Sequence, residues 1–125
     1  MRCLVIERST RRPGMAVFAD GELLCAREWD GEPARAPVWL EELASALKTC
    51  GITVADVGRF ISGLGPGSFS GLRAGLSAMQ GMALPGGKPV YGVASAAALA
   101  LGQGCGAECV TVVGDARRDR LWSVT

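Results

Sequence analysis

The chain has 125 residues, of which 49% are hydrophobic and 20% are charged, so it can bury the core of one globular domain. Lys and Arg total 13 against 12 for Asp and Glu, and the resulting net charge of +1 excludes the basic surface of an independent nucleic-acid binder. No stretch reaches the roughly 18 apolar residues of a membrane span, and the apolar run at Cys3–Ile6 is too short for a signal peptide, so we expect a cytoplasmic protein.

The N-terminal quarter of the sequence predicts an antiparallel meander. Apolar runs at Cys3–Glu7 and Met15–Ala19 predict the first two strands, and Glu22–Glu28 predicts the third. Asp20-Gly21 separates the second and third strands and is a strong signal for a two-residue hairpin turn. We therefore expect these two strands to pair in antiparallel fashion.

The next segment predicts a helical crossover. Trp29–Pro37 contains Asp, Gly and two Pro and is expected to be a loop. Val38–Cys50 has apolar residues at helical spacing, and Gly51 supplies a C-terminal stop. The following strand, Val57–Ser62, should lie parallel to an earlier strand because a helix connects them.

The rest of the chain alternates helices and strands. Helices are expected at Ser70–Ala83, which Pro85-Gly86-Gly87 ends, and at Ser95–Gly102; strands are expected at Pro89–Val93, Cys109–Val113 and Arg120–Thr125. A meander followed by helix–strand units predicts an α/β fold with a mixed sheet, and residues 1–125 should form a single domain. The chain stops directly after a strand-like segment, which indicates that a second domain is absent or truncated.

The segment Gly63–Gly75 is the most informative part of the sequence. It places glycines between a predicted strand and a helix, with Ser68 or Ser70 available to cap the helix. Two functions remain open for it. The loop could hold an anion at the start of the helix, with Arg73 near by, or it could simply pack the helix tightly against the sheet. No Gly-Lys-Ser/Thr follows, so this is not the phosphate-loop pattern of nucleotide hydrolases.

The residues of this loop resemble the signature of a known family. Gly65-Pro66-Gly67-Ser68-Phe69-Ser70-Gly71-Leu72-Arg73 is similar to the GPGSFTGLR signature of TsaB proteins, formerly called YeaZ. Three flanking segments resemble further parts of that family's pattern: Val5–Thr10, Pro89–Ser95 and Asp115–Trp122. The resemblance runs across most of the chain, and its nine-residue signature is more specific than a lone glycine motif.

The resemblance implies a fold and a role. The fold would be an RNase H-like half-domain of the actin-like ATPase (ASKHA) group. The role would be that of a non-catalytic scaffold or activator in making N6-threonylcarbamoyladenosine at position 37 of tRNA (t6A37). The implied partners are the catalytic subunit TsaD and the ATPase TsaE, and tRNA would be reached only through that complex. Older names describe such chains as glycoprotease or M22 peptidase homologues.

The peptidase name finds no support in the residues. The chain contains no histidine, so it lacks histidine-based zinc sites and Ser-His or Cys-His nucleophiles. We therefore expect no catalytic residue, no metal and no cofactor. The alternative function is a nucleotide- or phosphate-binding module of the actin-like type, with Glu7, Asp115 and Asp119 as the acidic set for Mg²⁺. Glu7 and Arg8 stand where the family has Asp and Thr.

Two sets of candidate site residues follow. The candidate anion or nucleotide contacts are Glu7, Arg8, Gly65, Gly67, Ser68, Arg73 and Asp115, with Arg11 and Arg12 adding to the cations near Arg8. The candidate partner interface is formed by the outer faces of the two helices after the signature: Leu72, Gly75, Leu76, Met79, Met82, Ala94, Ala97, Ala98 and Leu101. A helix that is apolar on every side is normally buried, so these helices should meet TsaD or a second copy of the chain in a four-helix contact. Alone, the chain is expected to be a homodimer.

Overall fold

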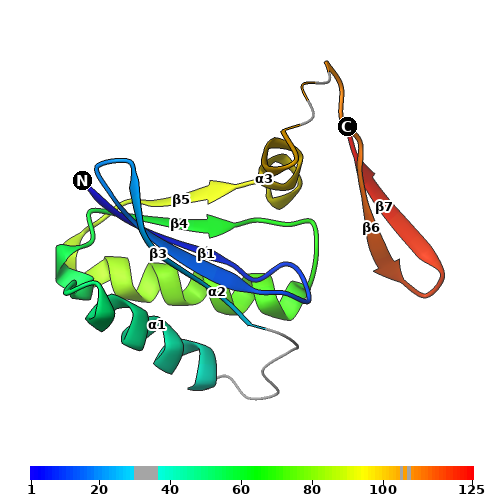
Figure 1. The fold of residues 1–125 in the computed structure, drawn as a ribbon. Helices are drawn as coiled ribbons and strands as arrows, with labels where there is room; N and C mark the ends of the chain where they lie inside the picture. The colour runs from blue at the N-terminus through cyan, green and yellow to red at the C-terminus, as the bar shows by residue number, and fades with distance from the viewer. Residues whose placement is uncertain (30–36, 105, 107) are drawn as a thin grey trace.

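A computed structural model describes residues 1–29, 37–104, 106 and 108–125. Within these residues the main sheet contains five strands, in the order β3-β2-β1-β4-β5 (Figure 1). The strands are β1 (Arg2–Glu7), β2 (Gly14–Ala19), β3 (Glu22–Glu28), β4 (Arg59–Gly63) and β5 (Val90–Val93). The predicted mixed α/β fold is confirmed, because a meander is followed by helix–strand units.

The pairing of the strands follows from their connections. β1, β2 and β3 are antiparallel neighbours, and Asp20 and Gly21 make the turn between β2 and β3 with φ angles of 52° and 87°. Both angles are positive, as this tight hairpin turn requires. β4 lies parallel to β1, and β5 lies parallel to β4, because a helical connection precedes each of them.

Two helices cover one face of the main sheet (Figure 1). They are α1 (Pro37–Thr49) and α2 (Phe69–Ala83). Gly51, with φ of 65°, follows α1, and two short 3-10 turns, η1 (Val54–Asp56) and η2 (Leu84–Gly86), lead into the next strands. The third helix, α3 (Ser95–Gly102), lies at the carboxyl end of β5.

The core lies between the main sheet and these two helices. Strand alternation places Leu4, Ile6 and Val17 on the helix side, where they are fully buried. Helix α1 contributes Trp39 and Leu43 to the same core. The remaining buried apolar residues are Met15, Ala46, Leu47, Ile52, Val57, Phe60, Met79, Ala83 and Ala96. The other face of the sheet is only partly buried in the described chain.

The last two strands form a separate two-stranded sheet, β6 (Val112–Arg117) and β7 (Arg120–Val124). The predicted strand at Cys109–Val113 is therefore wrong in its bounds. The apolar run suggested a strand that ends at Val113, but pairing with β7 carries the strand onward through the polar residues to Arg117. Figure 1 shows this hairpin beyond α3, apart from the main sheet.

Elsewhere the predicted bounds differ from the observed ones by a residue or two. The largest of these shifts is in β4, which begins at Arg59 and not at Val57, because Val57 ends the η1 turn by donating its N–H to Val54. The predicted loop Trp29–Pro37 lies outside the described residues except at its two ends, where Trp29 follows β3 and Pro37 begins α1.

Candidate functional site

The glycine loop connects β4 to α2 and packs against the turn that follows β1. The backbone N–H of Ser68 donates to the carbonyl oxygen of Ser9 over 2.7 Å. A Cβ atom added at Gly67 would overlap the backbone of Ser9, and one added at Gly71 would overlap the carbonyl oxygen of Arg8. The glycines are thus required where two backbones meet, which supports the packing function of the loop.

Helix α2 begins at Phe69, one residue before the predicted start, and one of the two candidate serines caps it. Ser68 is its N-cap residue, and its Oγ accepts a hydrogen bond of 3.2 Å from the N–H of Gly71. Of the N–H groups in this part of the loop, those of Ser68, Gly71 and Leu72 are therefore already bonded within the chain. Fewer N–H groups are therefore left to bind an anion than at the N-terminus of an uncapped helix.

The loop is also tied to the start of α3. The N–H of Gly65 donates to the Oγ of Ser95 over 2.9 Å, and the N–H of Ser95 donates to the carbonyl oxygen of Gly65 over 2.9 Å. Gly65 has a φ of 84°, and the peptide bond between Gly65 and Pro66 is cis. Ser95 is buried, so this reciprocal pair fixes α3 to the glycine loop and hence to α2.

The candidate acidic residues lie on different sheets. Glu7 ends β1, and its Oε1 accepts a hydrogen bond of 2.6 Å from the N–H of Ser9 while its carboxylate lies against Gly63 of β4. Asp115 lies within β6, where its Oδ1 accepts a hydrogen bond of 2.7 Å from the N–H of Arg117. The predicted strand Cys109–Val113 would have placed Asp115 after a strand, but the residue lies inside one. Asp119 lies in the β6–β7 turn.

No metal-binding cluster forms in the described part of the chain. Within these residues, no three His, Cys, Asp or Glu side chains are placed so that they could hold one ion. The described cysteines, Cys3, Cys25, Cys50 and Cys109, are free thiols.

The candidate cations contact aromatic rings. The guanidinium of Arg8 lies 4.4 Å from the ring centroid of Trp39 in α1, and that of Arg73 lies 5.8 Å from the ring centroid of Phe69. Burial lowers the pKa of Arg8 from its ordinary value. Arg12 pairs with Glu28 over 3.1 Å at the exposed end of the meander. Of the three arginines expected in one cluster, Arg8 and Arg12 thus have different partners.

The candidate interface residues fall into three groups. Gly75 and Met79 are buried on the side of α2 that faces the sheet, so their predicted place on an outer face is wrong. The physical reason is that the sheet covers this stripe of the helix. Leu72, Leu76 and Met82 are half-buried, whereas Ala94, Ala97, Ala98 and Leu101 are exposed, with Leu101 82% exposed.

Sequence reasoning missed several exposed apolar residues in and around the glycine loop. Phe69, the first residue of α2, is 76% exposed, and Leu64 and Val93 are also exposed. The N–H of Leu64 donates a hydrogen bond of 2.9 Å to the carbonyl oxygen of Val93. The side chain of Leu64 packs over Gly92. We call the exposed apolar residues of this region, Leu64, Val93, Ala94, Ala97, Ala98, Leu99 and Leu101, the α3 surface. The signal was available in the sequence, since Leu64 interrupts a run of glycines.

An open pocket of about 230 Å³ lies at the other end of α2. Its lining is mostly apolar, with Lys88 as the charged residue, and it comprises Val54, Ala55, Met82, Pro85, Gly86 and Lys88. None of the candidate anion contacts lines it. In the described residues, no helix is long and apolar enough to cross a membrane.

Comparisons with known proteins agree with one another. A family model described as "TsaD: tRNA N6-adenosine threonylcarbamoyltransferase" matches residues 38–125. The tRNA threonylcarbamoyladenosine biosynthesis protein TsaB of Escherichia coli (strain K12) is 33% identical over 107 residues, which cover 82% of this chain and 44% of that protein. An uncharacterized protein of Mycobacterium tuberculosis (strain ATCC 25618 / H37Rv) is 41% identical over 114 residues, which cover 90% of this chain and 49% of that protein.

The fold agrees with solved structures as well. The structure of YeaZ from Pseudomonas aeruginosa superposes with a TM-score of 0.85 at 29% identity, covering 96% of this chain and 57% of that one. The RNase H-like, actin-like half-domain that the resemblance implied is thereby confirmed. The chain spans about half the length of the curated relatives that it matches.

Proposed function

Because the chain belongs to the TsaB/YeaZ family, we propose that it acts in the synthesis of N6-threonylcarbamoyladenosine in tRNA, as a non-catalytic partner of a TsaD-like subunit. In this role the chain takes no part in the chemistry and offers a surface to which the TsaD-like subunit binds. In this proposal a TsaE-like ATPase joins the same complex, tRNA is reached only through that complex, and the chain works in the cytoplasm.

The α3 surface is the observation that supports this proposal most directly. Leu99 and Leu101 are 46% and 82% exposed on a helix that carries no charged residue, and two further exposed apolar residues, Leu64 and Val93, lie near the start of that helix. An apolar area of several neighbouring residues is typical of a protein interface. The alanines Ala94, Ala97 and Ala98 allow a second helix to approach closely.

The packed glycine loop supports the non-catalytic part of the proposal. Two of its glycines, Gly67 and Gly71, pack against the backbone of Ser9 and Arg8. The hydrogen bonds between Gly65 and Ser95 place α3 relative to α2. The loop therefore orients the docking helices and has a structural use that needs no ligand. The acidic set proposed for Mg²⁺ is divided between two sheets, which weighs against the nucleotide-binding alternative.

The test is complex formation with the TsaD-family subunit of the same organism, measured by sedimentation and by isothermal titration. Ala98→Glu and Leu101→Glu each place a charge on the α3 surface and should weaken the complex by at least ~10-fold. Leu84→Glu is the matched control, because Leu84 is 80% exposed at the far end of α2. Circular dichroism checks that each variant is folded. Equal affinity in all three variants would refute this docking face.

Sedimentation of the chain alone tests the proposed homodimer with the same variants. If the α3 surface also pairs two copies, Ala98→Glu should give a monomer and Leu84→Glu should not. Calorimetry with ATP and Mg²⁺ addresses the alternative, since tight binding by the isolated chain would favour a nucleotide-binding module over a scaffold.

A further inference from the structure

Five buried polar atoms in the described residues have no hydrogen-bond partner. They are Nε and Nη1 of Arg8, Oγ of Ser9, and the indole nitrogens of Trp29 and Trp39. Two of these side chains belong to residues that are almost fully buried, since Ser9 is 4% exposed and Trp39 is 2% exposed. Most buried polar groups in proteins are paired, so a group of unpaired ones calls for an explanation.

These atoms share one chemical character. The guanidinium of Arg8 and the two indole N–H groups can only donate hydrogen bonds, and the hydroxyl of Ser9 can donate as well as accept. No carboxylate in the described residues forms an ion pair with Arg8, since the described pairs join Met1 to Asp20, Arg2 to Asp56 and Arg12 to Glu28. The nearest acid in sequence, Glu7, accepts a hydrogen bond from the N–H of Ser9 and lies against Gly63.

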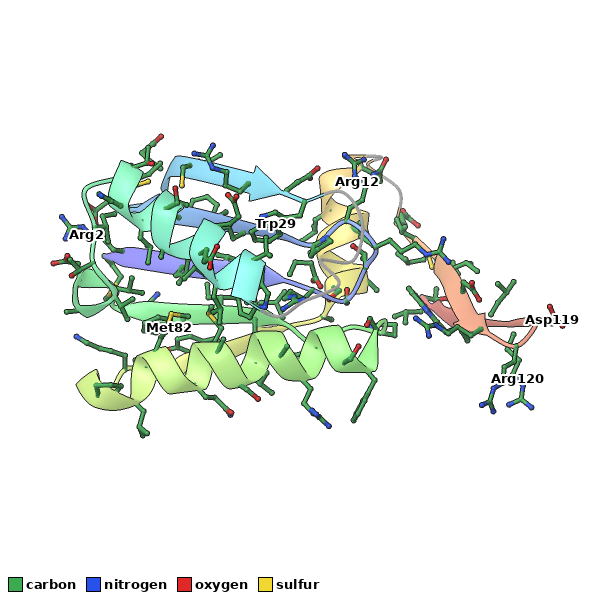
Figure 2. All side chains as sticks on the ribbon, turned by 90° about the horizontal axis from the view of Figure 1, so that it is seen from below. Arg2, Arg12, Trp29, Met82, Asp119 and Arg120 are labelled. Atoms are coloured by element: carbon green, nitrogen blue, oxygen red, sulfur yellow. The ribbon has the colours of Figure 1, made fainter. Side chains whose placement is uncertain are left out.

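The donors come from elements that pack together. Arg8 follows Ile6 and lies on the helix side of the sheet, where its Cβ and Cγ face Gly75 of α2. Its guanidinium stacks over the ring of Trp39 in the first turn of α1. Trp29 follows β3, against which α1 packs, and Figure 2 shows it close to the first turns of α1. The positive end of the α1 dipole adds to the same field.

We propose that Arg8, Trp29 and Trp39 form a binding site for a small oxyanion, either a carboxylate or a phosphate. A guanidinium binds an oxyanion through two parallel N–H bonds, and an indole N–H at the edge of the stacked ring supplies another. The bound charge would offset that of the half-buried cation, whose pKa burial already lowers. This site lies on the α1 side of Arg8, away from the glycine loop.

Thermal unfolding of the whole chain in phosphate, sulfate, acetate or chloride, at one ionic strength, tests the proposal. Phosphate or acetate should raise Tm in a saturable manner by at least ~3 °C relative to chloride. The anion that gives the lower midpoint concentration identifies phosphate or carboxylate as the preferred chemistry. The absence of any saturable rise in both anions would overturn the proposal.

Three variants locate the effect. Arg8→Met keeps the length of the side chain and removes its charge, and it should lower the affinity for the anion by at least ~10-fold. Trp39→Phe keeps a ring beneath Arg8 and deletes one N–H donor, so it should lower the affinity by about 3-fold to 10-fold. Trp122→Phe is the control, because Trp122 lies in β7 of the separate hairpin.

Intrinsic fluorescence gives a second readout for the same titration. In the Trp122→Phe variant all emission comes from Trp29 and Trp39, and binding should change it with the same midpoint as the shift in Tm. If Arg8→Met fails to fold, Trp39→Phe alone decides the outcome. An anion effect that persists unchanged in Trp39→Phe would place the anion elsewhere and overturn the proposal.

Discussion

The N–H of Ser68 and the carbonyl oxygen of Ser9 are joined by a hydrogen bond of 2.7 Å, although 59 positions separate the two residues in sequence. This bond fastens the first residue of the α2 cap to the turn after β1. Gly67 and Gly71 lie on either side of it, each against backbone atoms. Backbone cannot move aside as a flexible side chain can, so this junction is sensitive to any added Cβ.

Two glycines of α2 should therefore respond oppositely to the same substitution. Gly71→Ala places a Cβ against the carbonyl oxygen of Arg8 and should destabilise the protein by about 1–3 kcal/mol. Gly81→Ala meets no atom within 4 Å and should stabilise it by about 0.5–1 kcal/mol, because alanine favours a helix. Urea unfolding measures both. A Gly71→Ala variant as stable as the natural protein would contradict the packing role of the loop.

The buried hydroxyl of Ser95 should contribute more to the free energy of unfolding than an exposed serine hydroxyl does. Ser95→Ala leaves the N–H of Gly65 without its side-chain acceptor and should cost about 1–3 kcal/mol in the free energy of unfolding. The control is Ser77→Ala, an exposed position in the middle of α2, where we expect a change within about 0.5 kcal/mol. Urea unfolding compares the two variants, and similar losses in both would rule out a special role for Ser95.

The carboxyl group of Asp56 should titrate at unusually low pH. The N–H of Thr53 donates to Asp56 Oδ2 over 2.8 Å and the Thr53 hydroxyl donates over 2.7 Å, and these bonds hold the pKa of Asp56 below its ordinary value of 3.8. Thr53→Ala removes the hydroxyl and should raise that pKa toward 3.8, which carbon-detected NMR titration follows directly. An unchanged midpoint would show that the hydroxyl does not act on the carboxylate.

The lowered pKa of Asp56 also determines how the free energy of unfolding changes with pH. The folded pKa of Asp56 lies below its unfolded value, so the ionised group stabilises the fold above about pH 4 and loses this contribution as the pH falls through the folded pKa. Acid unfolding of Thr53→Ala should therefore depend less steeply on pH below about 4 than that of the natural protein.

The thiol of Cys25 should react slowly with alkylating reagents. Burial raises its pKa above the ordinary value of 9.0, and a hydrogen bond with the thiol of Cys50 raises it further. Iodoacetamide at pH 8 should modify the exposed Cys109 well before Cys25, as peptide mass spectrometry can follow. Cys50→Ala should speed the reaction of Cys25 by removing one of the two causes. A Cys25 as reactive as Cys109 would contradict its burial.

Local signals predicted the local structure well. Asp20-Gly21 specified its turn because both residues tolerate positive φ, and Ser68 specified the start of α2 because its side chain caps the helix three residues on. Each of these features depends on a few neighbouring residues only. The parallel direction of β4 was also predictable, because a helical crossover favours parallel strands, but the sequence did not indicate which earlier strand β4 would join.

Features that depend on distant residues were not predictable. The helical spacing of α2 showed two apolar stripes, and only contact with the sheet decides that Gly75 and Met79 are buried while Leu72 is half-exposed. The stacking of Arg8 on Trp39 joins the end of β1 to α1, and no local pattern signals it. Asp115 lies within a strand only because β6 pairs with β7, and the polar residues at the end of β6 resemble a loop in the sequence.

The order of strands in the main sheet has a consequence for synthesis. β1 emerges first from the ribosome, but one of its two neighbours, β4, follows only after β2, β3 and α1 have been made. Until then the nascent chain can close the meander, yet it leaves the second edge of β1 bare. Unpaired strand edges are where unfinished chains associate wrongly. In this topology one edge of β1 therefore stays open to wrong association until β4 has been made.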